Sequence, residues 1–134
     1  MRCILAMGAL AAGLALGFGL GVGGAAANGV PEADSRLISV AEVWNLFSGN
    51  SEVAVGSDRR VYYDPNGRAV GVAGIERLDG VWFVDPLGRH CFRWRGDDKT
   101  RCDEILREGK RYVRVRGEKR RHLIEIRPGN PFRL

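Results

Sequence analysis

The chain has 134 residues, 19 of which are glycine, and carries a formal net charge of +5 at neutral pH. A chain of this length forms one small domain with a modest hydrophobic core, which excludes a multidomain protein. Its 2 histidines and 3 cysteines do not show the spacing of a zinc site, so we expect neither a metal nor a cofactor.

Residues 1–27 have the pattern of an export signal. Arg2 supplies a positive start, residues 3–22 are apolar and uncharged, and residues 25–27 are three alanines suited to cleavage after Ala27. The alternative is an uncleaved membrane anchor, because an uncharged stretch of this length can span a bilayer. The many glycines and the absence of a basic cluster after the stretch favour cleavage. The sequence therefore predicts an exported protein, periplasmic or secreted, with no stable membrane span after cleavage.

Residues 28–38 are interpreted as a flexible leader, and a helix is expected over residues 40–48. Ser39 and Glu42 form a capping box, in which the serine side chain accepts a backbone N–H of the first turn and the glutamate reaches back. Four apolar side chains follow at helical spacing: Val40, Val43, Trp44 and Phe47. We expect this single amphipathic helix to cover a sheet.

Beyond Asn50 the pattern changes to short alternating runs separated by Gly, Pro and Asp turns, which is typical of antiparallel β structure. Closing an up-and-down arrangement into a small barrel removes exposed strand edges, so a barrel is favoured over a sandwich. The domain would span residues 39–130, with residues 131–134 as a tail. Its strands are expected near residues 52–55, 60–63, 68–74, 80–84, 89–95, 98–106, 110–116 and 119–127.

Loss of the export signal leaves two cysteines, Cys91 and Cys102, which in an oxidising compartment most simply form a disulfide. A two-residue turn at residues 96–97 would place these cysteines directly opposite each other on a hairpin. The same register places His90 opposite Asp103. Because the cysteine pair and the turn give one pairing independently, each supports the other.

The last predicted hairpin carries the most basic surface. A turn at residues 117–118 would place Arg114 opposite Arg121. It would also place Arg116 opposite Lys119, and like charges directly opposite each other destabilise a sheet. The alternative is an ordinary solvated face that water and salt screen. Five residues make up the candidate site for phosphate or carboxylate: Arg114, Arg116, Lys119, Arg120 and Arg121.

Aromatic side chains are candidates either for the core or for the lining of a pocket. Core is favoured, because a barrel of eight short strands is usually filled by its own side chains. A hollow, lipocalin-like barrel is the alternative. His90 and His122 are candidate acid–base groups, but no nucleophile accompanies them, so no catalytic residue is expected. The candidate core or pocket aromatics are Trp44, Trp82, Phe92 and Trp94.

Several motifs occur in a recognisable order: AEVWNLFSGN at 41–50, YYDPNG at 62–67, GVWFV at 80–84, CFRW at 91–94, and Cys102. With the export signal before them, they resemble a family of small exported bacterial proteins classed as a domain of unknown function. The resemblance covers nearly the whole mature domain. It implies a Gram-negative periplasmic protein and assigns no catalytic residues.

Together these features predict a non-enzymatic envelope protein that binds another protein or an anionic surface. One alternative is a carrier of a small apolar ligand, and a second is a module similar to a protease inhibitor. Nucleic acid is not expected as a partner, because an exported protein seldom meets it and few aromatic residues interleave with the basic ones. The sequence does not predict the oligomeric state.

Overall fold

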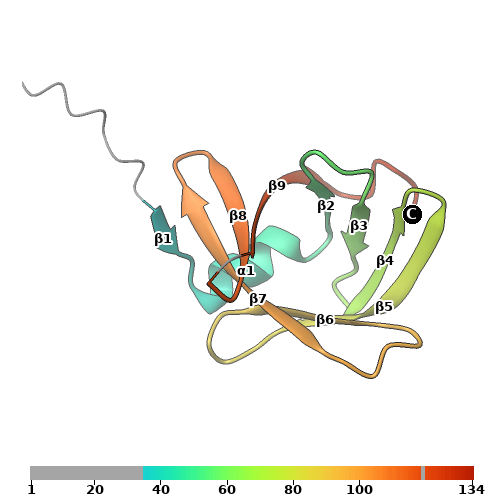
Figure 1. The fold of residues 1–134 in the computed structure, drawn as a ribbon, viewed down its shortest axis with the longest axis horizontal. Coiled ribbons are helices and arrows are strands. Elements are labelled where there is room, and N and C mark those ends of the chain that lie inside the picture. Colours follow the sequence, from blue (N-terminus) through green and yellow to red (C-terminus); the bar gives the residue numbers. More distant parts are fainter. Residues whose placement is uncertain (1–34, 119) are drawn as a thin grey trace, which may run out of the picture.

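The computed structural model describes residues 35–118 and 120–134, which form a closed barrel of eight antiparallel strands with one extra strand and one short helix (Figure 1). The predicted export signal and residues 28–34 of the predicted leader lie outside the described residues. Within the described part, no helix is both long and apolar enough to cross a lipid bilayer.

The barrel wall consists of strands that follow one another in sequence order, each antiparallel to the next, which confirms the up-and-down barrel. The last strand pairs with the first and closes the wall. The largest difference from the predicted bounds is in the strand expected at residues 80–84, which already begins at Glu76, where Ala73 pairs with Glu76 in a tight hairpin. The strands of the wall are β2 (Asn50–Ala54), β3 (Arg60–Tyr63), β4 (Arg68–Ala73), β5 (Glu76–Val84), β6 (His90–Trp94), β7 (Arg101–Glu108), β8 (Arg111–Arg116) and β9 (Arg120–Pro128).

The end of the predicted leader is a strand, so the expectation of a flexible segment is wrong there. Strand β1 (Ser35–Leu37) pairs with the second half of β7. Its pairing has a simple cause, because β6 contacts only the first residues of β7, up to Asp103, and leaves the rest of that edge open. The Ile38 N–H extends this pairing by donating to the Ile105 carbonyl at 3.2 Å, and the Ile38 side chain is buried.

The predicted helix forms as α1 (Val40–Phe47), and its capping box is confirmed. The Ser39 hydroxyl accepts the Glu42 N–H at 3.3 Å, and Glu42 accepts the Ser39 N–H at 2.9 Å. A hydrogen bond from Arg36, together with those from Ser39, lowers the pKa of Glu42 to about 2. The carboxylate is therefore charged at neutral pH, and a negative charge at the N-terminus of a helix is stabilised by the helix dipole.

Helix α1 fills one end of the barrel with apolar side chains. Val43 and Phe47 are fully buried, and α1 lies against β2 and β5. Phe47 packs edge-on against Tyr63 at 5.3 Å and lies 4.0 Å from the ring of His90. This end of the interior is therefore core, as the barrel's size predicted.

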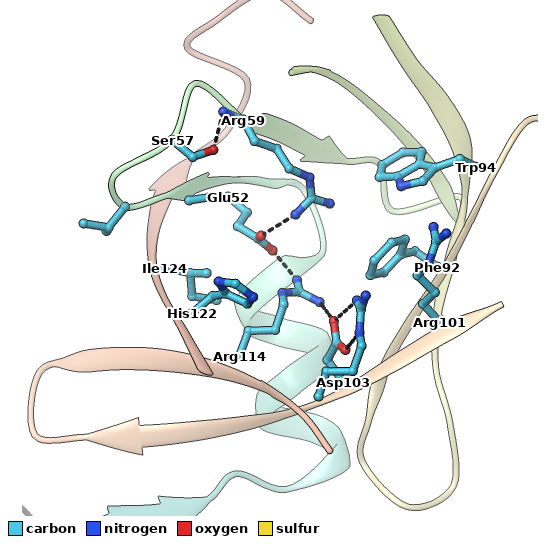
Figure 2. A pocket seen from close by; sticks show the side chains of 13 residues that line it. Glu52, Ser57, Arg59, Phe92, Trp94, Arg101, Asp103, Arg114, His122 and Ile124 are labelled. Carbon is cyan, nitrogen blue, oxygen red and sulfur yellow. Dashed lines mark hydrogen bonds and ion pairs between the residues drawn. The ribbon is translucent and has the colours of Figure 1, made fainter. Parts of the chain in front are cut away.

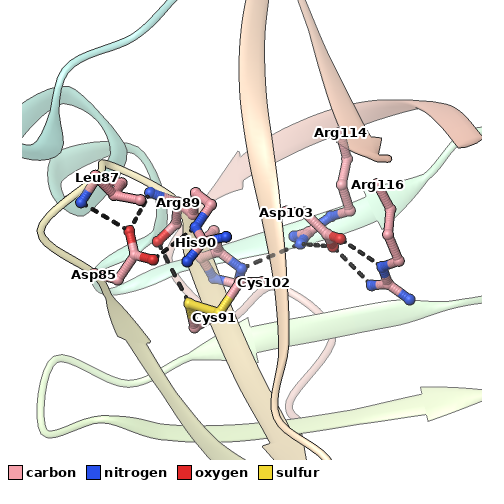
Figure 3. Close-up of a disulfide and its surroundings, with 9 residues drawn as sticks. All are labelled: Asp85, Leu87, Arg89, His90, Cys91, Cys102, Asp103, Arg114 and Arg116. Atoms are coloured by element: carbon pink, nitrogen blue, oxygen red, sulfur yellow. Dashed lines mark hydrogen bonds and ion pairs between the residues drawn. A yellow bond between two sulfur atoms is a disulfide. The ribbon is translucent and has the colours of Figure 1, made fainter. Parts of the chain in front are cut away.

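The β6–β7 hairpin has the predicted register, with Cys91 opposite Cys102 and His90 opposite Asp103. The cysteines form a disulfide with an S–S distance of 2.05 Å (Figure 3). The predicted two-residue turn is wrong, because six residues, 95–100, separate the two strands. Past Trp94 the chain stays with β5, where the Arg95 N–H donates to the Asp79 carbonyl at 2.7 Å.

The β8–β9 hairpin differs from prediction by one residue. Arg114 pairs with His122, and Arg116 with Arg120, so the predicted pairs of Arg114 with Arg121 and of Arg116 with Lys119 are wrong. A shift of one residue turns a whole strand over. The observed register directs Ile124 and Ile126 inward, whereas the predicted one would have placed Glu125 inside. Burial of the two isoleucines therefore decides the register.

Strands β5 and β6 approach each other closely at Gly80. At Gly80 a β-carbon would lie 2.3 Å from the carbonyl oxygen of Arg93, closer than any side chain allows. Glycine is required there because backbone, which cannot rotate away, occupies the space. Residues 131–134, predicted as a tail, lie against the domain: the Arg60 guanidinium is 5.1 Å from the Phe132 ring centre.

Candidate functional site

A pocket of about 380 Å³ lies inside the barrel, and none of the residues that line it belongs to α1 (Figure 2). Its side chains come from β2, β6, β7, β8 and β9 and from the loop between β2 and β3. The volume falls in the usual range of small-molecule sites, about 300–1,000 Å³. The interior is thus filled near α1 and hollow beyond it.

The floor of the pocket is a buried ion cluster centred on Arg114. One guanidinium nitrogen donates to Asp103 at 2.8 Å and the other donates to Glu52, and these carboxylates are each 1 % exposed. The Tyr63 hydroxyl donates to Glu52 at 3.1 Å. Arg116 donates twice to Asp103, at 2.5 and 2.8 Å, so Asp103 lies between two arginines (Figure 3).

The charges of the neighbouring groups keep Arg114 and Asp103 ionised. Burial opposes the charge of Arg114, but Glu52 and Asp103 outweigh it and raise the pKa of the guanidinium. Burial likewise opposes the charge of Asp103, but the hydrogen bonds and charges of Arg116 and Arg114 lower the pKa of its carboxyl. Burial, together with the charge of Glu52, raises the pKa of the Tyr63 hydroxyl. The tyrosine is therefore a hydrogen-bond donor at neutral pH.

His90 lies beneath the cluster and is sealed from the pocket. Its Nδ1 is 3.1 Å from an Arg114 guanidinium nitrogen, which can only donate, so Nδ1 accepts and the proton is on Nε2. Burial, helped by the positive charge of Arg114, holds the pKa of His90 well below its usual value. The ring is fully buried against Phe47 and Trp82. His90 therefore takes part in the core and cannot reach a ligand.

The Asp103 pairing expected for His90 holds at the level of the backbone only. The two residues lie opposite each other on β6 and β7, but the hydrogen bond of the ring goes to Arg114. His122, the other candidate acid–base group, is exposed on β9 and lines the pocket.

Arg59, in the loop before β3, lies across the pocket from this floor (Figure 2). One of its guanidinium nitrogens is 3.4 Å from Glu52, a long contact. The other, Nη2, is buried and has no hydrogen-bond partner among the residues that the structure describes. The guanidinium also lies 5.6 Å from the ring centre of Phe92 and 5.7 Å from that of Trp94. An arginine held over aromatic rings with one free edge is a ready donor for an anion.

The pocket has a surplus of positive charge. Four arginines line it, at positions 59, 101, 114 and 116, together with the carboxylates of Glu52 and Asp103. Asp97 does not line the pocket, but its carboxylate pairs with Arg101 at 2.7 Å. Among these four arginines and three carboxylates, one positive charge remains uncompensated. The rest of the wall is apolar: Ala54, Val55, Phe92, Trp94 and Ile124.

The structure divides the predicted anion site between two faces of the sheet. Arg114 and Arg116 point inward into the ion cluster, whereas Arg121 is exposed and pairs with Glu108. Lys119 and the side chain of Arg120 lie outside the described part of the chain.

The predicted aromatic set is divided as well. Trp82 belongs to the core, and Trp44 stacks on it from outside at 4.9 Å while remaining 40 % exposed. Phe92 and Trp94 both line the pocket, but Phe92 is only 3 % exposed and belongs to the core as well, whereas Trp94 is partly exposed. Sequence reasoning missed Glu52 and Arg59. The inward register of Ile124 and Ile126 would have directed Arg114 into the barrel and so required a buried acid there.

Comparison of the chain with family models, with curated proteins and with solved structures finds no match. The resemblance to a family of exported proteins therefore stays a prediction. What the chain does must be argued from the chemistry of the pocket.

Proposed function

We propose that this is an exported, non-enzymatic binding protein that holds a small anion in the hollow part of its barrel. The observation that carries the proposal is the unmatched positive charge of the pocket together with the free edge of Arg59. Donors that are already held in place bind an anion at little cost in ordering. Burial in a partly apolar pocket strengthens each such contact.

Export is supported by the disulfide between Cys91 and Cys102 and by the pattern of residues 1–27. Disulfides persist in oxidising compartments and are rare in the cytosol. The periplasm of a Gram-negative bacterium is the proposed location, in line with the family resemblance. The anion would then be a molecule that reaches the cell envelope.

Binding is favoured over catalysis because the buried acid–base groups in and beneath the ion cluster already have partners or are out of reach. Asp103 is held by two arginines and Glu52 by an arginine and a tyrosine, while His90 is sealed beneath them. A general base needs access to the proton it removes. None of these three groups has such access.

A purely apolar ligand, which was the alternative, fits this pocket less well. It would offer no acceptor to the Arg59 Nη2, which is already buried without a partner at a cost of about 1–3 kcal/mol, whereas an anion would supply one. The apolar wall still favours a ligand with an apolar part. The interior thus combines the anion site and the carrier cavity that the sequence presented as separate possibilities.

A thermal-shift series tests the proposal. The purified, disulfide-bonded protein is heated with benzoate, acetate, phosphate or sulfate, and at least one anion is expected to raise the melting temperature in a concentration-dependent way. Arg59→Met should abolish that rise. Arg121→Met is the matched control, because Arg121 is exposed on the outer face. No stabilisation by any anion, or an equal rise in Arg59→Met, would overturn the proposal.

A further inference from the structure

The charge balance of the pocket defines the class of anion that it fits. After the carboxylates of Glu52, Asp103 and Asp97 are counted against the four arginines, a single positive charge remains. A monoanion neutralises this charge, whereas a doubly charged phosphate would bring an excess of negative charge next to two buried carboxylates. A cation is not favoured, because the two acids of the floor, Glu52 and Asp103, are already paired with Arg114.

The free edge of Arg59 favours a flat anionic group. Its Nη2 has no partner among the described residues, and its Nη1 has only the 3.4 Å contact with Glu52. A guanidinium presents paired N–H groups in one plane, which match the two oxygens of a carboxylate. A carboxylate can take both positions once it displaces the weak contact with Glu52 and the side chains that cover Nη2.

The wall beside Arg59 favours an aromatic group on the same molecule. Phe92 and Trp94 lie under the guanidinium, and Trp94 remains partly exposed in the pocket. Aromatic rings prefer stacked or edge-on contacts with other rings, beyond the gain from buried area. Apolar side chains of β2 and β9, Ala54 and Ile124, complete the lining on the other strands.

The volume sets the size of that group. An apolar cavity of about 150 Å³ holds one benzene molecule. The pocket, at about 380 Å³, therefore has room for two fused rings and a carboxylate.

We propose that the ligand is an aromatic monocarboxylate of about two fused rings, with its carboxylate on Arg59 and its rings against Trp94, next to the buried Phe92. This inference rests on the proposed function and names its ligand class. Arg114 and Arg116 position the floor, because they donate to Glu52 and Asp103 and hold both carboxylates in place.

Calorimetric titration of the disulfide-bonded protein separates the parts of this proposal. The probes are 2-naphthoate, 2-naphthamide as its neutral counterpart, acetate as the charge without the ring, decanoate as an aliphatic acid, and naphthyl phosphate as a dianion. We expect 2-naphthoate to bind most tightly, and 2-naphthamide to bind about tenfold more weakly or worse, as loss of a charged hydrogen bond predicts.

Three variants test the assigned residues. Arg59→Met should weaken 2-naphthoate to the level of 2-naphthamide, and Arg59→Lys should recover only part of the loss, because lysine keeps the charge but not the planar edge. Trp94→Leu should weaken 2-naphthoate more than acetate. Each variant is first checked for an unchanged circular-dichroism spectrum, and Arg121→Met is the control that should change nothing.

The outcomes distinguish this inference from the proposed function. If acetate or decanoate binds as tightly as 2-naphthoate, the aromatic part is wrong while anion binding stands. If naphthyl phosphate binds more tightly, the single charge is wrong. If 2-naphthamide equals 2-naphthoate, or no probe binds, the proposed function falls as well.

Discussion

Replacing Arg114 by methionine removes the central cation of the buried cluster. The substitution keeps the length of the side chain but leaves Glu52, 1 % exposed, with only the Tyr63 hydroxyl and the distant Arg59 as partners. Asp103 suffers less, because Arg116 still donates to it twice. Removing one partner of a buried ion pair costs about 3–5 kcal/mol. Here the cost comes mainly from Glu52, whose carboxylate loses its main partner.

Urea unfolding of the oxidised protein, followed by tryptophan fluorescence, measures this loss. A domain of this kind has a free energy of unfolding of about 5–15 kcal/mol, so Arg114→Met should be close to the limit of folding. Arg121→Met, which breaks the exposed pair with Glu108, should cost about 1 kcal/mol or less. A loss below about 1 kcal/mol for Arg114→Met would refute the view that the cluster is buried and charged.

A second substitution identifies the cause of the loss. In the Arg114→Met protein, Glu52→Gln removes the charge that lost its partner, so it should recover part of the stability. In the wild-type background Glu52→Gln should instead destabilise, because Arg114 then loses an acceptor. Equal effects in both backgrounds would show that the two side chains do not interact.

The remaining predictions concern the disulfide, the sheet and pH. Cys91→Ala with Cys102→Ala should lower the free energy of unfolding by about 2–3 kcal/mol, since the bridge closes a short loop; an unchanged urea midpoint would contradict this. Gly80→Ala should cost about 1–3 kcal/mol in the same assay, because the added carbon meets the Arg93 carbonyl oxygen, and a loss near zero would mean that the strands do not approach so closely. His90 stays unprotonated in the fold because burial lowers its pKa, whereas the unfolded chain binds a proton below about pH 6.5. Stability should therefore fall as the pH drops through about 6.5, by up to about 1.4 kcal/mol per pH unit, and His90→Gln should flatten that slope; identical pH profiles for the two proteins would contradict it.

The barrel could be predicted from the sequence because its signals are local. Alternation of apolar residues and the spacing of Gly, Pro and Asp turns place the strands, and the capping box at Ser39 and Glu42 places the helix. The disulfide register followed from Cys91 and Cys102, whose pairing needs only one hairpin. Strand β1 was missed because three exposed residues have no apolar pattern of their own and pair only with a distant edge.

The binding site was harder to predict because it depends on contacts between distant strands. Glu52 and Arg114 lie 62 residues apart in the chain and meet only once the barrel closes. The β8–β9 turn was assigned two residues, and that single-residue error moved Arg121 to the inner face and Glu125 with it. The sequence signal for the true register is the pair Ile124 and Ile126, since isoleucine is buried far more often than glutamate.

The central claim, that the hollow part of the barrel receives an anion on Arg59, is tested most directly by nuclear magnetic resonance. The ¹⁵N-labelled, disulfide-bonded protein is titrated with 2-naphthoate to saturation. The largest shifts should come from the Arg59 Nε–H, the Trp94 indole N–H and the Phe92 amide, which surround the pocket. Shifts confined to α1 or to the outer face of β8 and β9, or no shifts at all, would contradict the claim.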